Sequence, residues 1–174
     1  MKPTQNSVGR PPLWARLVGT TAGCGYWPWG PGTMGAIAGV AIWVALATVI
    51  HSVPAMVAII SALIVIFTVL GVAAADCCEK YWGPDPSRVV MDETVGQWIT
   101  MLPLSPLVAC AGTLGQWSTW GWVALSLALF RFFDIVKPLG VRRMEALPGG
   151  RGVMADDILA GIYGAIILLI LRLI

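Results

Sequence analysis

Two apolar stretches of this chain each begin with a pair of adjacent acidic residues. Asp92 and Glu93 lie in VVMDETVGQWITML (residues 89–102), and Asp156 and Asp157 lie in GGRGVMADDILAGIYG (residues 149–164). Neighbouring carboxylates repel each other unless a cation lies close by. Carboxylates also stabilise a helix N-terminus without any further role, so capping is the alternative for both pairs. Capping explains the Asp156–Asp157 pair less well than it would explain a single acid, and both pairs are candidate ligands of a hard cation.

Basic residues recur at a helical interval in a third segment, FRFFDIVKP (residues 130–138). Arg131, Asp134 and Lys137 are three residues apart, so they share one face of a helix. The planar guanidinium of arginine suits phosphate oxygens, and lysine provides a point charge. Arg131 and Lys137 are therefore predicted to bind a substrate phosphate. A salt-bridge ladder within the segment is the alternative.

A fourth segment, GPGTMGAIAG (residues 30–39), places a Pro-Gly turn ahead of an apolar run. A helix that begins here would direct free backbone N–H groups and its positive end at a bound anion. This makes Gly32 and Thr33 candidate phosphate-binding residues. Gly35 and Gly39 also form a G-x-x-x-G pattern, which favours close packing of helices, so packing is the alternative role of this segment.

The available side chains favour magnesium over zinc. Magnesium prefers carboxylates and substrate phosphate oxygens, whereas zinc favours histidine and thiolate. The chain has a single histidine, and its four cysteines form no C-x-x-C pair. Glu79 could add a fifth carboxylate to the two acidic pairs. Since neighbouring helical residues point about 100° apart, Asp92 and Glu93 could bind one metal ion only at an irregular helix start.

Hydrolysis by an activated water is the phosphoryl-transfer chemistry that these residues support. A cysteine phosphatase needs arginine six residues after its cysteine, but those positions hold Gly30, Gly83, Pro84 and Gln116. The chain also lacks a D-x-D pair and a G-x-x-x-x-G-K-[ST] phosphate loop. What remains is a water activated by a metal and a carboxylate, with Arg131 or Lys137 neutralising the charge of the leaving oxygen.

The elements that hold these residues are expected to be membrane helices. Of the 174 residues, 57% are hydrophobic and 11% are charged, against about 25% charged in soluble proteins. The length suits a single domain over residues 1–174, with residues 1–16 as a flexible tail and no removable signal peptide. Five stretches approach the roughly 20 residues of a spanning helix: Met34–Ile50, Val53–Ala75, Thr94–Gly112, Trp117–Phe133 and Ile158–Ile174. The sequence thus predicts an all-α, multi-pass bundle of about five helices, in which Pro103 and Pro106 kink or shorten the third.

The charged residues predict which side of the membrane each connection faces. Lys and Arg concentrate before the first stretch, between the second and third, and between the fourth and fifth, whereas HSVP (51–54) and TLGQWSTWGW (113–122) contain none. By the positive-inside rule, the three basic regions are cytoplasmic. All nine acidic residues lie between Asp76 and Asp157 on the same predicted side. The net charge of +2 and the lack of a long basic run argue against nucleic acid as a partner.

In their order and separation, the segments GPGTMG, VVMDETVGQWITML, FRFFDIVKP and GGRGVMADDILAGIYGA resemble the motifs of the bacterial phosphatidylglycerophosphatase A family, over about residues 17–170. The resemblance implies a magnesium-dependent, multi-pass enzyme of the bacterial inner membrane with its active site facing the cytoplasm. Its reaction would be hydrolysis of phosphatidylglycerophosphate to phosphatidylglycerol and inorganic phosphate in phospholipid biosynthesis. The acidic residue that the family has ahead of a D-P turn is matched by Glu79, before Asp85 and Pro86.

The gathering of these motifs on one predicted face suggests hypothetical roles for their residues. The predicted metal ligands are Glu79, Asp92, Glu93, Asp156 and Asp157. The predicted catalytic residues are Asp92, Glu93, Arg131, Asp134, Lys137 and Asp157. The predicted contacts of the substrate phosphate are Gly32, Thr33, Arg131 and Lys137. Which acid holds the metal and which acts as the base stays open at this point.

Two other functions remain as alternatives. One is a phosphatase that acts on a different membrane lipid phosphate. The other is a small transporter or assembly subunit that uses its charges only to pair helices, in which case those charges should lie near the bilayer midplane or along a path. Their predicted position at one edge of the bundle favours the enzyme, and no feature of the sequence indicates an oligomeric state.

Overall fold

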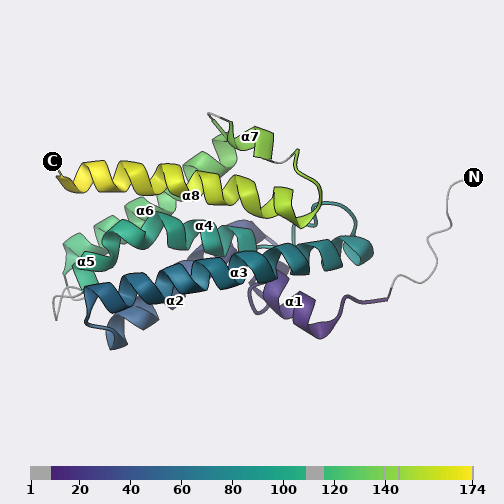
Figure 1. Ribbon diagram of the computed structural model, residues 1–174, viewed down its shortest axis with the longest axis horizontal. Helices are drawn as coiled ribbons and strands as arrows, with labels where there is room; N and C mark the ends of the chain where they lie inside the picture. The colour runs from purple at the N-terminus through teal and green to yellow at the C-terminus, as the bar shows by residue number, and fades with distance from the viewer. Residues whose placement is uncertain (1–8, 109–115, 139, 145, 174) are drawn as a thin grey trace, which may run out of the picture.

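The computed structural model describes residues 9–108, 116–138, 140–144 and 146–173, and in these ranges the chain forms helices and no strand. The elements in Figure 1 are, in chain order, α1 (Leu13–Gly19), the 3₁₀ turn η1 (Cys24–Tyr26), α2 (Pro31–Val49), α3 (Val53–Trp82), α4 (Met91–Met101), the 3₁₀ turn η2 (Leu102–Leu104), α5 (Ser105–Val108), α6 (Trp117–Val136), α7 (Val141–Met144) and α8 (Gly150–Leu173). The predicted all-α class is confirmed.

Four helices, α2, α3, α6 and α8, are long and apolar enough to cross a membrane. Their outward surfaces carry large apolar side chains, such as Val65 and Val69 on α3 and Ile170 on α8. Such surfaces suit contact with lipid, and a helix satisfies its own backbone hydrogen bonds there. The predicted multi-pass membrane bundle is therefore confirmed.

The third predicted span is not one of these four helices. In its place the structure has α4, η2 and α5 in succession. At 1.5 Å per residue α4 is about 16 Å long, roughly half the thickness of the hydrocarbon core. Pro103 and Pro106 lie where the regular helix breaks, because proline lacks the backbone N–H that an α-helix needs. Residues 109–112 of the predicted stretch lie outside the described residues.

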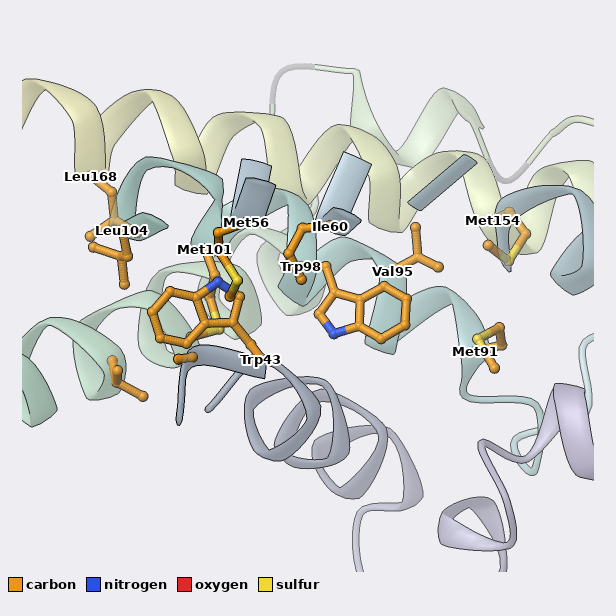
Figure 2. Close-up of a cluster of buried hydrophobic side chains, with 12 residues drawn as sticks. Trp43, Met56, Ile60, Met91, Val95, Trp98, Met101, Leu104, Met154 and Leu168 are labelled. Carbon is orange, nitrogen blue, oxygen red and sulfur yellow. The ribbon is translucent and has the colours of Figure 1, made fainter. Parts of the chain in front are cut away.

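The short helix α4 lies inside the bundle, against α2, α3, α6 and α8. Nine of its eleven residues are buried. Figure 2 shows Trp98 and Met101 of α4 among buried side chains of the surrounding helices, including Trp43 of α2 and Met56 and Ile60 of α3. This packing fixes the position of α4, and with it the acids of its first turn.

Small residues allow α4 to approach its neighbours closely. A Cβ atom on Gly161 of α8 would lie 2.5 Å from the carbonyl oxygen of Gly96, and one on Gly35 of α2 would lie 2.6 Å from that of Val90. Any side chain larger than hydrogen would push these helices apart. The packing role considered for the glycines of residues 30–39 is confirmed.

Helices α3 and α8 extend beyond the apolar stretches that predicted them. The helix α3 continues to Trp82, and α8 begins at Gly150 rather than Ile158. Asp156 and Asp157 consequently lie six and seven residues past the start of α8, too far along to cap its free N–H groups. Capping is therefore the wrong explanation for this pair, whereas Asp92 and Glu93 do lie in the first turn of α4.

The predicted N-terminal tail is partly helical. The helix α1 begins at Leu13 and packs along α3, so residues 13–16 of the predicted tail form its first turn. Residues 1–8 of that tail lie outside the described part of the chain.

Candidate active site

Five helix ends meet at one end of the bundle: the N-terminal ends of α2, α4 and α8, and the C-terminal ends of α3 and α6. A cavity of about 460 Å³ opens between them. Acidic and basic residues from separate parts of the sequence line it, namely Glu79, Asp85, Asp92, Glu93, Asp134, Lys137, Asp156 and Asp157. All five predicted metal ligands therefore line this one cavity.

Arg131 bridges two of these acids. Its Nη1 atom lies 2.6 Å from Oε2 of Glu93 on α4 and 2.7 Å from Oδ2 of Asp134, one turn further along α6. A ladder confined to residues 130–138 does not account for the contact with α4. Arg131 is not among the residues that line the cavity, so its contacts hold Glu93 and Asp134 in position.

Lys137 joins the end of α6 to α8. Its Nζ atom lies 2.6 Å from Oδ2 of Asp156. Helix α6 ends where Lys137 adopts a left-handed conformation with a φ of 49°, which is uncommon for a residue other than glycine. Because Lys137 also lines the cavity, its ammonium group is placed to serve both Asp156 and a bound anion.

Asp92 and Asp157 are buried in the cavity wall without a basic partner. Their exposed fractions are 9% and 3%. Oδ1 of Asp92 is fully buried and accepts no hydrogen bond within the described structure. The ion pairs found among the described residues involve Arg131 and Lys137 and leave out both aspartates. Since buried charges are normally paired or coordinate a metal, these two carboxylates suit a cation.

The first turn of α4 is not part of the four helices that are long enough to span a membrane. Burial raises the pKa values of both acids in this turn, Asp92 and Glu93. It raises the pKa of Glu93 to about 7, and the nearby Arg131 guanidinium only partly opposes this effect. It also raises the pKa of Asp92 well above its usual range, with the charge of Glu93 adding to the effect. A bound cation would lower both pKa values, because a nearby opposite charge favours the ionised form.

Gly32, at the start of α2, lies directly against the side chain of Glu93 on α4. A Cβ atom on Gly32 would come within 1.6 Å of Oε1 of Glu93, so a side chain there would have to displace the Glu93 carboxylate. The predicted turn precedes α2, with Gly30 in the left-handed region at a φ of 68°. Gly32 lines the cavity, whereas Thr33 is exposed and is not part of the lining. Of the four predicted phosphate contacts, Gly32 and Lys137 therefore line the cavity, whereas Thr33 and Arg131 do not.

Two acids near the end of α3 support the surrounding chain. The backbone N–H of Gly150 donates to Oδ1 of Asp76 at 2.7 Å, which satisfies one of the free N–H groups at the start of α8. The backbone N–H of Asp85 lies 3.4 Å from Oε1 of Glu79 and donates weakly to it. Sequence reasoning missed the role of Asp76, because it placed the start of the last helix at the Asp156–Asp157 pair rather than at Gly150.

A divalent cation in this cavity would have few protein ligands. Among the described residues, no group of three or more His, Cys, Asp or Glu side chains is arranged so that it could hold a metal ion. Magnesium usually takes one or two carboxylates and completes its shell with water and substrate phosphate oxygens. Asp92 and Asp157 best match that pattern, because Glu93 and Asp156 already have basic partners.

Buried polar side chains of α4 hold the helix that carries Asp92. Nε2 of Gln97 donates to Oγ of Ser126 on α6 at 3.1 Å, and Nε1 of Trp98 donates to the carbonyl oxygen of Gly39 on α2 at 3.0 Å. Sequence reasoning did not assign these residues. The signal for them is a polar residue, Gln97, within a stretch that is otherwise suited to lipid.

Comparison with known proteins places the chain in a family. The sequence profile of the phosphatidylglycerophosphatase A family matches residues 17–172. Two proteins with that name are similar to it. The one from Haemophilus influenzae is 33% identical over 79% of this chain and 76% of its own length, and the one from Escherichia coli is 31% identical over 87% and 80%.

Another relative has a different name. A protein of Bacteroides thetaiotaomicron, provisionally named a phosphatidylinositol-3-phosphatase, is 46% identical over 94% of this chain and 96% of its own length. No solved structure matches the chain at a significant level. Because the family profile covers most of the sequence, the chain belongs to the phosphatidylglycerophosphatase A family.

Proposed function

We propose that this chain hydrolyses the terminal phosphate monoester of phosphatidylglycerophosphate and releases phosphatidylglycerol and inorganic phosphate. The main support is the presence of Asp92, Asp157 and Lys137 in one cavity at the ends of helices that can cross a membrane. Carboxylates for a cation and an ammonium group for phosphate oxygens are what this hydrolysis requires. Family membership connects that chemistry with the lipid substrate.

In the proposed reaction, the oxygen of a water molecule attacks phosphorus while the bond from phosphorus to the glycerol oxygen breaks. One of the cavity carboxylates accepts the proton that the water loses. The glycerol oxygen leaves and takes up a proton to become the hydroxyl group of phosphatidylglycerol. Lys137 would neutralise charge on the phosphate or on the leaving oxygen, and Arg131 would keep Glu93 and Asp134 in place.

Magnesium is the proposed cofactor, and when bound it would neutralise phosphate oxygens and activate the water. Asp92 and Asp157 would hold it, since in the described part of the chain they are buried and have no basic partner. Glu79, Glu93 and Asp156, which line the same cavity, remain predicted ligands. Gly32, which lines the cavity at the positive end of α2, remains a predicted phosphate contact through its backbone.

The cavity is proposed to face the cytoplasm from the inner membrane of a bacterium. Basic residues gather at the same end of the bundle, including Lys80, Arg88, Lys137 and Arg142, and the positive-inside rule assigns such an end to the cytoplasm. The acyl chains of the substrate would then stay in the bilayer, along the exposed apolar faces of the helices. Only the headgroup would have to reach the cavity.

A second candidate substrate is a phosphorylated inositol lipid. The relative provisionally named a phosphatidylinositol-3-phosphatase shares 46% of its residues with this chain, against 33% and 31% for the two phosphatidylglycerophosphatases. Both substrates are phosphate monoesters on a lipid headgroup, so the same cavity chemistry serves either. They differ in the bulk of the headgroup, which the lining of the cavity must accommodate.

A substrate comparison tests the proposal. Purified protein is assayed for phosphate release, with magnesium, from phosphatidylglycerophosphate, from phosphatidylinositol 3-phosphate and from a water-soluble phosphate monoester. A higher kcat/KM for the first lipid supports the proposal, and a higher value for the inositol lipid establishes the second candidate in its place. Equal turnover of all three would contradict selection of a lipid. The Asp157→Asn variant is the control for activity that does not come from this cavity.

A further inference from the structure

A second cavity, separate from the catalytic one, lies beside the same end of the bundle. Its volume is about 260 Å³, and it is lined by Arg10, Pro11, Arg16, Tyr26, Trp82 and Arg88. It shares no lining residue with the catalytic cavity. Three of these six residues are arginines and none is acidic, so the cavity is complementary to an anion.

The three guanidinium groups are not neutralised by the protein. In the described ranges of the chain, no hydrogen bond or ion pair engages the side chains of Arg10, Arg16 or Arg88 with an acid. Nε of Arg16 is fully buried and has no hydrogen-bond partner. Because a buried donor normally has a partner and like charges repel, an anion bound here would satisfy both the donor and the charge.

Aromatic rings hold Arg88 in a way that leaves its donors available. Its Cζ atom lies 5.9 Å from the ring centroid of Tyr26 and 5.6 Å from that of Trp82. The two rings contact each other edge to face, with centroids 6.3 Å apart. A cation–π contact uses the face of the guanidinium, while the N–H groups at its edge suit the oxygens of a phosphate.

The chain around this cavity is suited to the surface of a membrane. Leu13, Trp14 and Leu17 of α1 have exposed fractions of 62%, 48% and 50%, and their spacing places them on one face of the helix. Trp27 and Trp29, just beyond α1 and η1, are also exposed. Exposed tryptophan and leucine beside basic residues are typical of a segment that lies in the headgroup region.

The second cavity and the catalytic cavity share a wall, the loop that joins α3 to α4. Arg88 stands between Ser87 and Val89, which both line the catalytic cavity. The turn η1 packs on the backbone of this loop, since a Cβ atom on Gly25 would lie 1.9 Å from the carbonyl oxygen of Arg88. A ligand bound to Arg88 would therefore contact the loop that forms this shared wall.

We propose that the cavity lined by Arg10, Arg16 and Arg88 binds the phosphodiester headgroup of an anionic membrane phospholipid, as a site distinct from the catalytic one. The bound lipid would fix α1 to the membrane surface and steady the loop over the catalytic cavity. This binding does not depend on which phosphate monoester the enzyme hydrolyses. A lipid is favoured over a soluble anion because the exposed apolar face of α1 adjoins the cavity.

A lipid-binding measurement on the full chain in neutral detergent tests this site. Phosphatidylserine serves as the probe, because it is an anionic phosphodiester that neither candidate reaction produces, and phosphatidylcholine is the neutral comparison. Binding is measured by native mass spectrometry for the wild type, for Arg16→Gln/Arg88→Gln and for Arg142→Gln/Arg143→Gln. The last variant is a matched control, since it removes the same charge from two exposed residues of α7.

The proposal predicts tighter binding of phosphatidylserine than of phosphatidylcholine by the wild type, and a loss of about tenfold or more in Arg16→Gln/Arg88→Gln. The control variant should bind like the wild type. Equal affinity in all three proteins would overturn the site, and displacement of phosphatidylserine by an equal concentration of inorganic phosphate would overturn its assignment to a lipid. If the double variant does not fold, Arg10→Gln, on the exposed segment before α1, is measured in its place. It must bind phosphatidylserine more weakly than the wild type does, and unchanged affinity would overturn the site.

Discussion

Nη1 of Arg131 lies 2.6 Å from Oε2 of Glu93, a contact between α6 and α4 across 38 positions of the sequence. The same nitrogen lies 2.7 Å from Asp134, so one guanidinium partly balances two acids. The ammonium group of Lys137 likewise balances part of the charge of Asp156. Asp92 and Asp157 are buried and have no basic partner among the described residues, and a bound cation would balance their charges.

The Arg131–Glu93 pair should show a strong energetic coupling. Arg131→Met leaves Glu93 and Asp134 half-buried without their cation, which we expect to lower the free energy of unfolding by about 1–3 kcal/mol. Glu93→Gln removes one of these charges, so the double variant should recover part of the loss. Thermal unfolding of the four proteins in detergent measures the coupling. Additive effects of the two substitutions would show that the contact contributes nothing.

The Asp92→Asn substitution should separate stability from activity. It removes a buried charge that has an unpaired oxygen, so without metal the variant should unfold at the same temperature as the wild type or a higher one. Phosphate release should nevertheless fall by about 100-fold or more. Asp85→Asn, at an exposed position of the cavity rim, is the control for stability. A marked loss of stability in Asp92→Asn would mean that its charge is balanced within the protein.

The close packing of α4 depends on Gly96. A Cβ atom there would lie 2.4 Å from Cε2 of Phe130 and 2.7 Å from the carbonyl oxygen of Asp157, so Gly96→Ala must shift Phe130 and change the spacing between α4 and α8 at Asp157. We expect a loss of about 1–3 kcal/mol in unfolding free energy, together with loss of activity. Gly121→Ala on α6 is the matched control, because nothing lies within 4 Å of its Cβ position. A similar effect of both substitutions would rule out a specific role for the contact.

Asp76 should stabilise the start of α8 without taking part in phosphate release. Asp76→Ala leaves the N–H of Gly150 without its acceptor, which typically costs about 1 kcal/mol. Asp76→Asn retains a side-chain oxygen and should recover most of that loss. Comparing unfolding temperatures of the two variants checks this. Equal destabilisation by Ala and Asn would indicate that the negative charge of Asp76 matters more than the hydrogen bond.

The sequence predicted the gathering of the site residues because hydropathy and charge locate helix ends. Apolar stretches mark the membrane helices, and the charged residues next to them must then lie at the ends of the bundle. Asp92, Lys137 and Asp157 were placed together by this reasoning alone, and the structure puts all three on one cavity. Four long helices and a short buried α4 replace the five predicted spans.

Helix boundaries and side-chain pairing were harder to predict. Hydropathy marks the part of a helix that faces lipid, so it does not locate the end of α3 at Trp82, and it missed the glycine-rich start of α8. Pairings such as Lys137 with Asp156 depend on how the helices pack and leave no trace in spacing along the chain. The exposure of Thr33 likewise follows from the orientation of α2, which its first residues do not fix.

Dependence of turnover on a divalent cation is the most direct test of this account. Phosphate release from phosphatidylglycerophosphate is measured with purified protein in magnesium, after chelation, and after magnesium is restored, for the wild type and for Asp157→Asn. The account predicts that chelation abolishes wild-type turnover, that magnesium restores it, and that Asp157→Asn stays inactive or needs far more magnesium. Full turnover in the presence of chelator, or an Asp157→Asn variant with the wild-type response to magnesium, would contradict it.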